Sequence, residues 1–221
     1  MKKEINIIFF GAPGAGKGTQ AKKISSNLIL PHVDTGNLIR EAIVNKTELG
    51  EKAQSFVESG KLVPDQLVID LIREKLIVLK GRVFKGFILD GYPRTIPQAN
   101  ALEKLLGELN LELTCVINVQ APESILVKRL SSRRLCSNKN CGEIYNLLTK
   151  KPKAEGKCNL CGSNLYQRKD DTEEAAKERL SEYHNKTAPL EKYYRDKGKL
   201  CDVDGTKDPN EVYNEIIKIV S

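Results

Sequence analysis

The segment Ile5 to Thr19, INIIFFGAPGAGKGT, constrains this chain most, because an apolar β-type run leads directly into a glycine-rich loop. Glycines permit backbone conformations and close approaches that side chains would block, so successive amide N–H groups can point at phosphate oxygens. Lys17 adds a positive charge, and the helix predicted to follow directs its positive N-terminal end at the same place. A turn without a ligand is the alternative, but strand, loop, lysine and helix come in the order that a polyphosphate site requires. The segment therefore predicts a nucleotide phosphate site.

The loop departs from the common phosphate-loop pattern at one position. In that pattern a serine or threonine follows the lysine directly. Here Gly18 follows Lys17, and Thr19 comes one position later. The departure calls for further motifs before the kind of nucleotide site can be assigned.

Length and composition predict a single soluble enzyme. The chain has 221 residues, of which 40% are hydrophobic, so it can bury one sizeable core with room for small excursions. No apolar run approaches the roughly 18 residues that a membrane span needs, and the charged N-terminal segment leads to a functional loop. We therefore expect a cytoplasmic protein with no membrane partner. The net charge of +7 suits nucleic acid and polyphosphate equally.

Short apolar runs alternate with helical stretches, which predicts an α/β fold with a parallel sheet flanked by helices. Five runs are the expected strands: Ile5 to Phe10, a short run ending at Val33, Val83 to Leu89, Thr114 to Val119, and Leu200 to Val203. A polar helical region is predicted over Leu38 to Gly60. A further helix is predicted from about Gln66 to Leu79, with Asp65 as its N-cap and Gly81 as its stop.

Residues 132–171 interrupt this alternation. They contain four of the six cysteines and many lysines and asparagines, and they have little apolar periodicity. This composition predicts a small inserted domain.

Two further loops are expected beside the phosphate loop, because ligands of open parallel sheets bind at the carboxyl ends of strands. The first is HVDTGNLIR, residues 32–40, in which a helix starting at Thr35 and Gly36 would carry Arg40 one turn inside. The second is DGYPRTIPQ, residues 90–98, which follows an apolar strand.

The second loop begins with Asp90 and contains Arg94. A carboxylate at a strand end beside a phosphate loop can hold the waters of a magnesium ion, although a turn residue before glycine is the simpler alternative. Pro93 and Pro97 stiffen the backbone around Arg94, so its guanidinium has a defined direction.

The motifs GxPGxGKGT, TGNLIR, GKLV and DGYPRT occur in the order and spacing of the adenylate kinase family of nucleoside monophosphate kinases. The chain resembles this family from about Ile5 to Val220. The resemblance implies a P-loop parallel five-stranded sheet flanked by helices, with a helical insertion and a small lid. The implied domains are a core of residues 1–33, 64–131 and 172–221, an AMP-binding domain of residues 34–63, and a zinc-binding lid of residues 132–171.

The resemblance also implies two nucleotide sites, for ATP and AMP, and a catalytic set. The implied ATP residues are Gly14, Ala15, Gly16, Lys17, Gly18, Thr19, Arg129, Arg133, Ile144, Tyr145 and Lys207. The implied AMP residues are Thr35, Gly36, Arg40, Lys61, Leu62, Val63, Gly91, Tyr92, Pro93, Arg94, Gln98, Arg168 and Arg179. The implied catalytic residues are Lys17, Asp90, Arg40, Arg94, Arg129, Arg133, Arg168 and Arg179.

Six of the ten arginines fall on these positions, in a chain that otherwise uses lysine for positive charge. A guanidinium is planar, always charged and bidentate, so it holds a phosphoryl group firmly. Arg129 and Arg133 are four residues apart and share a helix face if the helix continues that far. Arg168 is expected just before a helix that starts with the capping-box spacing of Asp171 and Glu174, and Arg179 about two turns inside it.

The implied reaction is a reversible, magnesium-dependent transfer of the terminal phosphoryl group of ATP directly to AMP, which gives two ADP. Both phosphates are anionic, so catalysis requires charge neutralisation, alignment and exclusion of water by a closing lid. No covalent intermediate or general base is needed. His32 and His184 are accordingly interpreted as structural or solvated.

Four cysteines, Cys136, Cys141, Cys158 and Cys161, have the spacing of a closed tetrahedral zinc site that stabilises a lid without a core of its own. Four residues separate the first pair, which is wider than the CxxCG usual in zinc-lidded members. Two disulfides are the alternative, although cytosolic thiols stay reduced. Cys115 and Cys201 lie in predicted strands and are interpreted as buried apolar residues.

Three positions depart from the family pattern. Asp34 stands where a small residue is common, Asn37 replaces the aspartate of TGDxxR, and Tyr92 replaces phenylalanine. A kinase for CMP, UMP or GMP remains an alternative, as does a zinc-ribbon nucleic-acid-binding protein with an ATPase domain. We expect a monomer that binds ATP, AMP and ADP and no nucleic acid.

Overall fold

The computed structural model describes residues 4–59, 61–81, 85–138 and 140–220. Its centre is a five-stranded parallel sheet in the order β2-β3-β1-β4-β8. The strands are β1 (Ile5–Phe10), β2 (His32–Asp34), β3 (Gly86–Asp90), β4 (Cys115–Gln120) and β8 (Leu200–Asp204). The predicted fold class is therefore confirmed. The third strand begins at Gly86, and the first residues predicted for it, 83 and 84, lie outside the described residues.

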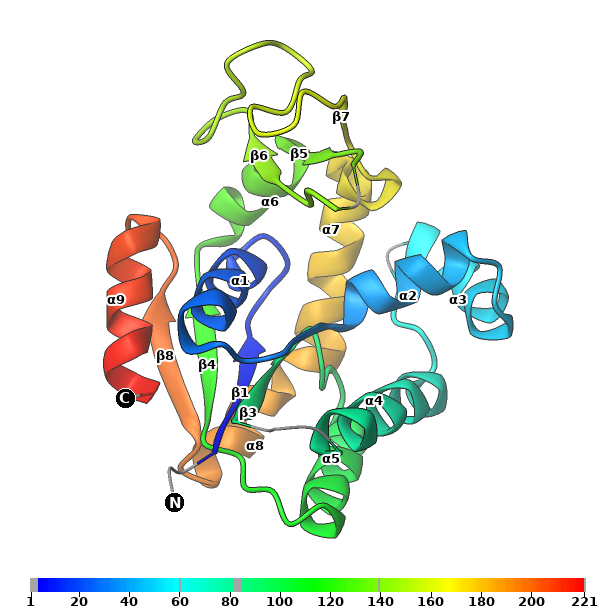
Figure 1. The fold of residues 1–221 in the computed structure, drawn as a ribbon, viewed down its shortest axis with the longest axis vertical. Coiled ribbons are helices and arrows are strands. Elements are labelled where there is room, and N and C mark those ends of the chain that lie inside the picture. The colour runs from blue at the N-terminus through cyan, green and yellow to red at the C-terminus, as the bar shows by residue number, and fades with distance from the viewer. Residues whose placement is uncertain (1–3, 60, 82–84, 139, 221) are drawn as a thin grey trace.

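Helices cover the sheet, as expected for parallel strands joined by crossovers. They are α1 (Lys17–Leu28), α4 (Asp65–Lys80), α5 (Ile96–Glu108), α6 (Glu123–Ser131), α7 (Glu173–Glu182), α8 (Pro189–Asp196) and α9 (Pro209–Val220). In Figure 1, α1 lies in front of the strands and α9 beside β8. The apolar runs of the central strands account for the core, since Ile7, Ile88 and Ile117 are fully buried. None of the described helices has the length and apolar character needed to cross a membrane.

Helix α4 begins one residue earlier than predicted. Its N-cap is Pro64, and Asp65 is the first helical residue, so the prediction of Asp65 as the cap is wrong. The Asp65 carboxylate instead accepts hydrogen bonds from Thr95 and Gln98 of the neighbouring α5 region. Gly81 ends the helix as predicted.

The predicted polar helical region consists of two helices within residues 34–63, and its predicted end, Gly60, lies outside the described residues. The helices are α2 (Thr35–Val44) and α3 (Glu48–Glu58), and Thr47 caps the second by accepting a hydrogen bond from the Gly50 N–H at 3.1 Å. A Cβ atom at Gly50 would lie 2.1 Å from the Ala42 carbonyl oxygen, so glycine allows the two helices to pack closely. Helix α2 begins at Thr35 and carries Arg40, as predicted.

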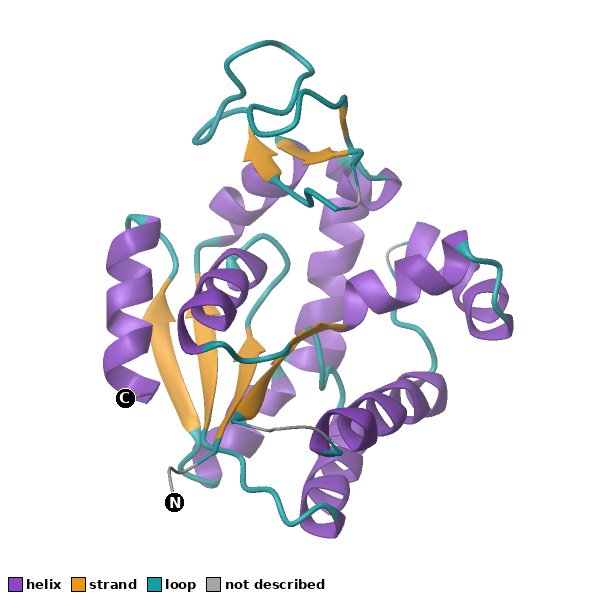
Figure 2. Ribbon diagram, viewed as in Figure 1, coloured by secondary structure: helices purple, strands orange, loops and turns teal. Residues whose placement is uncertain are grey.

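The lid segment, residues 132–171, forms a separate three-stranded antiparallel sheet in the order β6-β5-β7. Its strands are β5 (Arg133–Cys136), β6 (Ile144–Asn146) and β7 (Leu165–Tyr166). Figure 2 shows that loops make up most of this segment. Helix α6 ends at Ser131, so Arg133 lies on β5 and does not share a helix with Arg129.

The chain returns from the lid through a short 3-10 turn, η1 (Lys169–Asp171), into α7. Thr172 caps α7 by accepting a hydrogen bond from the Ala175 N–H, so the predicted capping role of Asp171 is wrong. The Asp171 side chain is fully buried and pairs with arginines instead. A π-helical turn, η2 (Tyr183–Thr187), joins α7 to α8.

Candidate functional site

The phosphate loop connects β1 to α1 at the carboxyl end of the sheet. Gly11 has a φ of 126°, and a Cβ atom there would lie 2.3 Å from the Val119 carbonyl oxygen, so the turn requires glycine. Lys17 donates hydrogen bonds to the carbonyl oxygens of Gly11 at 2.7 Å and Ala12 at 2.9 Å. Burial lowers the pKa of Lys17 to about 8, while Asp90 opposes this shift. The loop thus holds a cation that a phosphate group would stabilise.

The structure accounts for Gly18 after Lys17. A Cβ atom at Gly18 would lie 3.2 Å from Oδ2 of Asp90, which is a tight contact. Asp90 is the last residue of β3 and only 7% exposed, so its carboxylate faces the loop from the neighbouring strand. Glycine therefore leaves room for this carboxylate where other phosphate loops have a hydroxyl.

His32 also belongs to this site, although its place in the sequence did not indicate this. Its Nε2 lies 3.5 Å from Oδ2 of Asp90. The contact results from the parallel register of β2 and β3, which pairs Asp34 with Asp90 and brings the two strand ends side by side. His32 therefore contacts the carboxylate predicted to serve magnesium, which is consistent with a structural role.

The predicted ATP residues beyond the loop lie in two places. Arg129 donates a hydrogen bond to the Gly205 carbonyl oxygen at 2.9 Å, and a Cβ atom at Gly205 would lie 2.7 Å from the Ala15 carbonyl oxygen. Arg129 and the phosphate loop thus meet beside the turn after β8. Lys207 follows in the same turn, but its exposed amine pairs with Glu215 of α9 at 3.0 Å.

Ile144 and Tyr145 lie on β6 of the lid. The Tyr145 side chain is 2% exposed, and its hydroxyl lies 3.5 Å from the Cys158 sulfur and accepts a hydrogen bond from the Asn159 N–H at 2.7 Å. A contact between Tyr145 and ATP would therefore use the main chain.

Ten of the predicted AMP residues line one cavity, open to solvent, between α2, α3, α4 and the loop after β3. They are Thr35, Gly36, Arg40, Lys61, Leu62, Val63, Gly91, Arg94, Gln98 and Arg179. The buried Thr35 hydroxyl has no hydrogen-bond partner among the described residues, so a ligand could use it. Three predicted AMP residues, Tyr92, Pro93 and Arg168, lie outside this lining, and Tyr92 instead donates a hydrogen bond to the Gln98 carbonyl oxygen. The apolar lining residues Ile39, Val57 and Val68 were missed, although their helical spacing marked them as inward-facing.

A second cavity adjoins the first. Lys17 lines it together with Gly11 and Pro13 of the phosphate loop. Leu62, Gly91, Arg94 and Arg179 line both cavities. Two arginines therefore stand where the phosphate loop and the first cavity meet.

The arginines around this junction are crowded. Burial lowers the pKa of Arg40 to about 10, with Arg168 adding to the shift, and burial likewise lowers the pKa of Arg179 to about 10. Buried like charges are costly unless anions neutralise them. Asp170 supplies one such anion, because Arg179 and Arg40 lower its pKa against the opposing effect of burial. The arrangement favours binding of further negative charge.

Asp171 ties the lid to the core. It accepts two hydrogen bonds from Arg133 of β5 and one from Arg179 of α7 at 3.0 Å. Arg133 and Arg179, which are 46 positions apart in the sequence, thus share one buried carboxylate. Sequence reasoning predicted both arginines and missed the aspartate that joins them.

The departures Asp34 and Asn37 have separate roles. Asp34 caps α2 by accepting a hydrogen bond from the Asn37 N–H at 2.9 Å. The Asn37 side-chain oxygen accepts from Arg40 at 2.9 Å and from Arg168 at 3.2 Å. Asn37 therefore holds two of the predicted phosphate-binding arginines without adding a negative charge.

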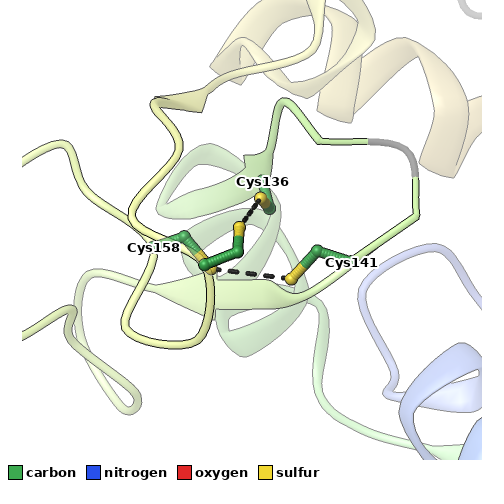
Figure 3. A group of neighbouring side chains, drawn as sticks. Cys136, Cys141 and Cys158 are labelled. Atoms are coloured by element: carbon green, nitrogen blue, oxygen red, sulfur yellow. Dashed lines mark hydrogen bonds between the residues drawn. The ribbon is translucent and has the colours of Figure 1, made fainter.

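The four lid cysteines come together. Their sulfur atoms all lie within 4.8 Å of one another, with 3.4 Å between Cys136 and Cys161 and 3.7 Å between Cys141 and Cys158. Figure 3 shows Cys136, Cys141 and Cys158 pointing toward a common centre. Tetrahedral zinc with Zn–S bonds of about 2.3 Å requires sulfur separations of about 3.8 Å.

The cluster therefore fits a zinc site, and the wider first pair does not prevent convergence. All six cysteines are free, so the disulfide alternative is not what the structure shows. The hydrogen bond with Tyr145 is the main cause that lowers the pKa of Cys158 to about 6, whereas burial raises the pKa of Cys136 to about 12, so a bound cation would have to stabilise the Cys136 thiolate. Outside the cluster, Cys115 is buried as predicted, whereas Cys201 is only half-buried.

Comparisons with known proteins agree with this geometry. A family model described as adenylate kinase matches residues 9–199. The chain is 50% identical to the adenylate kinase of Archaeoglobus fulgidus over 216 residues, which cover 98% of this chain and 98% of that protein. It is 48% identical to the adenylate kinase of Thermosipho melanesiensis, over 98% of this chain and 99% of that protein. The chain therefore belongs to the adenylate kinase family, and it is a nucleoside monophosphate kinase, a phosphotransferase.

Proposed function

We propose that this protein transfers the terminal phosphoryl group of ATP directly and reversibly to AMP, producing two ADP. The observation that carries this proposal is the pair of adjoining cavities, one containing Lys17 of the phosphate loop and the other the predicted AMP residues. Arg94 and Arg179 line both. A donor and an acceptor phosphate bound in the two cavities would meet at these two guanidinium groups.

The AMP molecule would occupy the cavity under α2 and α3. Its base would contact the apolar side chains of Ile39, Val57 and Val68 and the buried amide of Gln98. Its phosphate would lie toward Arg40 and Arg94. Each guanidinium can hold phosphate oxygens through two parallel hydrogen bonds, which fixes the direction of the acceptor oxygen.

The ATP phosphates would lie on the loop from Gly14 to Thr19, where the main-chain amides and Lys17 face them. Arg129, Arg133, Ile144, Tyr145 and Lys207 complete the proposed ATP site, and Arg168 is proposed to reach the phosphates when the lid closes. When bound, magnesium would neutralise charge on the phosphate groups. The Asp90 carboxylate, which faces Gly18, is suitably placed to hold waters of that ion.

The chemistry requires alignment and charge neutralisation rather than a nucleophilic side chain. Lys17, Arg94 and Arg179 supply positive charge at the junction of the cavities. The acceptor phosphate is already ionised at neutral pH, so the described site needs no general base. His32, which contacts Asp90, is proposed to orient that carboxylate and not to transfer protons.

Exclusion of water is proposed to come from two movable parts, the AMP-binding segment 34–63 and the lid segment 132–171, on a core of residues 1–33, 64–131 and 172–221. The contacts between the parts support this division. Arg168 reaches Asn37 at 3.2 Å, and Lys169 reaches Glu58 at 3.1 Å. These exposed pairs are individually weak, so they can exchange when substrates bind.

Zinc held by Cys136, Cys141, Cys158 and Cys161 is proposed to stabilise the lid, and no step of the transfer involves this metal. A cysteine zinc site needs reduced thiols, and the cytosol keeps thiols reduced. A cytoplasmic location is therefore proposed. A monomer is the proposed working form, since one chain supplies all residues of both proposed nucleotide sites.

The test is an acceptor series with ATP, magnesium and AMP, CMP, UMP or GMP in turn, with the diphosphates quantified by chromatography. We expect AMP to be the preferred acceptor. Preference for another monophosphate would show that the protein is a kinase with an acceptor other than AMP. Salt-sensitive binding of nucleic acid without diphosphate formation would instead favour the zinc-ribbon alternative.

A further inference from the structure

Gln98 lines the cavity under α2 and α3, and its side-chain amide is hydrogen-bonded through both its oxygen and its nitrogen. It is 2% exposed and lies in the first turn of α5, against the cavity under α2 and α3. Its side-chain oxygen accepts a hydrogen bond from the Arg94 N–H at 2.7 Å, and its side-chain nitrogen donates to Oδ1 of Asp65 at 2.8 Å. Tyr92 further anchors the Gln98 main chain by donating to its carbonyl oxygen at 3.1 Å.

These two partners impose one orientation on the amide. An ionised carboxylate only accepts hydrogen bonds, so Asp65 must face the Gln98 nitrogen. A main-chain N–H only donates, so Arg94 must face the Gln98 oxygen. Turning the amide by 180° would place the oxygen against the carboxylate and the nitrogen against the N–H, with both hydrogen bonds lost.

Asp65 is itself held in place. Its second oxygen accepts a hydrogen bond from the Thr95 hydroxyl at 2.8 Å, and Thr95 caps α5 through the Gln98 N–H. Asp65 is also the first residue of α4, where the helix dipole stabilises its negative charge. Among the described residues that line the cavity, Gln98 is present and Asp65 is not.

After these two hydrogen bonds, the Gln98 side-chain amide has one N–H donor and one oxygen lone pair left for a ligand. Glutamine pairs in this way with adenine, whose 6-amino group donates beside a ring nitrogen that accepts. At N1 and position 6 hypoxanthine has the opposite polarity, because its N1–H donates and its 6-oxo group accepts. It could pair with the same amide edge only after the amide turned over.

We infer that Asp65 is a specificity-determining positioning residue, which selects a 6-aminopurine over a 6-oxopurine monophosphate by fixing the orientation of the Gln98 amide. Asp65 acts through Gln98 and does not touch the substrate. The inference rests on the proposed AMP-dependent transfer and specifies how the acceptor base is chosen.

The test compares AMP with IMP as acceptors in the full-length protein and in the variants Asp65→Asn, Asp65→Ala and Asp70→Asn. Asp70 lies on the exposed face of the same helix and serves as the matched control. Asparagine at position 65 can donate as well as accept, so it removes the Asp65 constraint on the amide while the Arg94 N–H still favours the original orientation. We expect the AMP to IMP ratio of kcat/KM to fall about tenfold in Asp65→Asn, the size of one or two neutral hydrogen bonds.

Alanine offers no partner to either orientation, so Asp65→Ala should lose activity with AMP without gaining activity with IMP. The control Asp70→Asn should keep the wild-type ratio. Dissociation constants for both monophosphates, measured by calorimetric titration, provide the same ratio if turnover of IMP is too slow to measure. Melting temperatures establish that each variant is folded.

A role of Asp65 that is only structural would lower activity with AMP and IMP by the same factor in both Asp65 variants, and this result would overturn the inference. Failure of the wild-type protein to phosphorylate AMP would be a different result, which refutes the proposed function itself. The two failures are therefore distinguishable.

Discussion

The core sheet and the lid of this protein are stabilised by different physical means. The core buries a continuous apolar cluster over all five parallel strands and the helices around them. In the described part of the lid, the buried cluster consists of Cys136, Tyr145 and Cys158, with Cys141 and Leu165 packed against it. A segment of this size cannot bury enough apolar surface to fold on that basis alone. The difference predicts that loss of the proposed zinc would destabilise the lid segment more than the core.

Removal of the zinc proposed for the lid should have the largest effect and would test this difference. Structural zinc supplies about 10–16 kcal/mol of apparent folding free energy in small domains, so chelation should unfold the lid and abolish phosphoryl transfer to AMP. The thermal transition of the core should shift little. Hydrogen exchange of the lid amides, together with metal content and ADP formation, measures this outcome.

A pair of cysteine variants provides the control. Cys158→Ser removes a proposed ligand, whereas Cys201→Ser changes a half-buried cysteine of β8 far from the cluster in sequence. Only Cys158→Ser should reproduce the metal-free behaviour. Equal protection of the lid amides from hydrogen exchange with and without metal would show that the lid does not depend on zinc for its fold.

The second prediction concerns the carboxylate that joins the two regions. Asp171 is fully buried between Arg133 of the lid and Arg179 of the core. Breaking a buried ion pair from one side costs about 3–5 kcal/mol, and the lower end is expected because both arginines retain some contact with water. Asp171→Asn should therefore lower the free energy of unfolding by about 3 kcal/mol.

The matched control for that substitution is Asp196→Asn. Asp196 forms an exposed ion pair with Lys192 at 2.7 Å, which should contribute less than about 1 kcal/mol. Urea denaturation of both variants measures the difference. Similar losses of stability in the two would contradict the role of Asp171 as the joint between lid and core.

The smallest predicted effect concerns the core alone and is the uptake of a proton by Lys17 when ATP binds. Burial lowers the pKa of Lys17 to about 8 from its ordinary value of 10.5, so the nucleotide-free lysine is about half neutral at pH 8. ATP phosphates favour the charged form, and binding at pH 8 should therefore take up about half a proton. At pH 6 the lysine is already charged, and its contribution to uptake should vanish.

The lowered pKa of Lys17 also sets how the free energy of unfolding depends on pH. Between about pH 8 and 10.5 the unfolded chain binds this proton and the folded protein does not, so the contribution of Lys17 to stability rises with pH in this window. Calorimetric titration with ATP in buffers of different ionisation enthalpy measures the uptake. Lys17→Arg keeps a fixed charge, so equal uptake at pH 8 in this variant and in the wild type would disprove the assignment.

The central features of the core could be predicted from the sequence because they are local. The phosphate loop, the loops after two strands and the apolar periodicity each lie within a short segment, and the structure places them as expected. The cysteine cluster was also predictable, since the ligand type and the close spacing within each pair carry the signal.

The contacts that were missed join residues distant in sequence. The contact of His32 with Asp90 depends on how two strands register, and the bond between Asp65 and Gln98 on how α4 meets α5. Asp171 has the spacing of a helix cap, but its carboxylate pairs with two arginines instead. Burying these arginines without a carboxylate would be costly. Local patterns predict elements, whereas partner choice depends on packing between them.

The most direct test of the account follows the phosphoryl group of ATP by ³¹P NMR, with the zinc-loaded protein, magnesium and equimolar AMP. If the core aligns the two nucleotides and the lid excludes water, ATP and AMP should disappear together and ADP should form in twice the amount of either, without inorganic phosphate. Unchanged AMP with release of inorganic phosphate would show transfer to water and contradict the account.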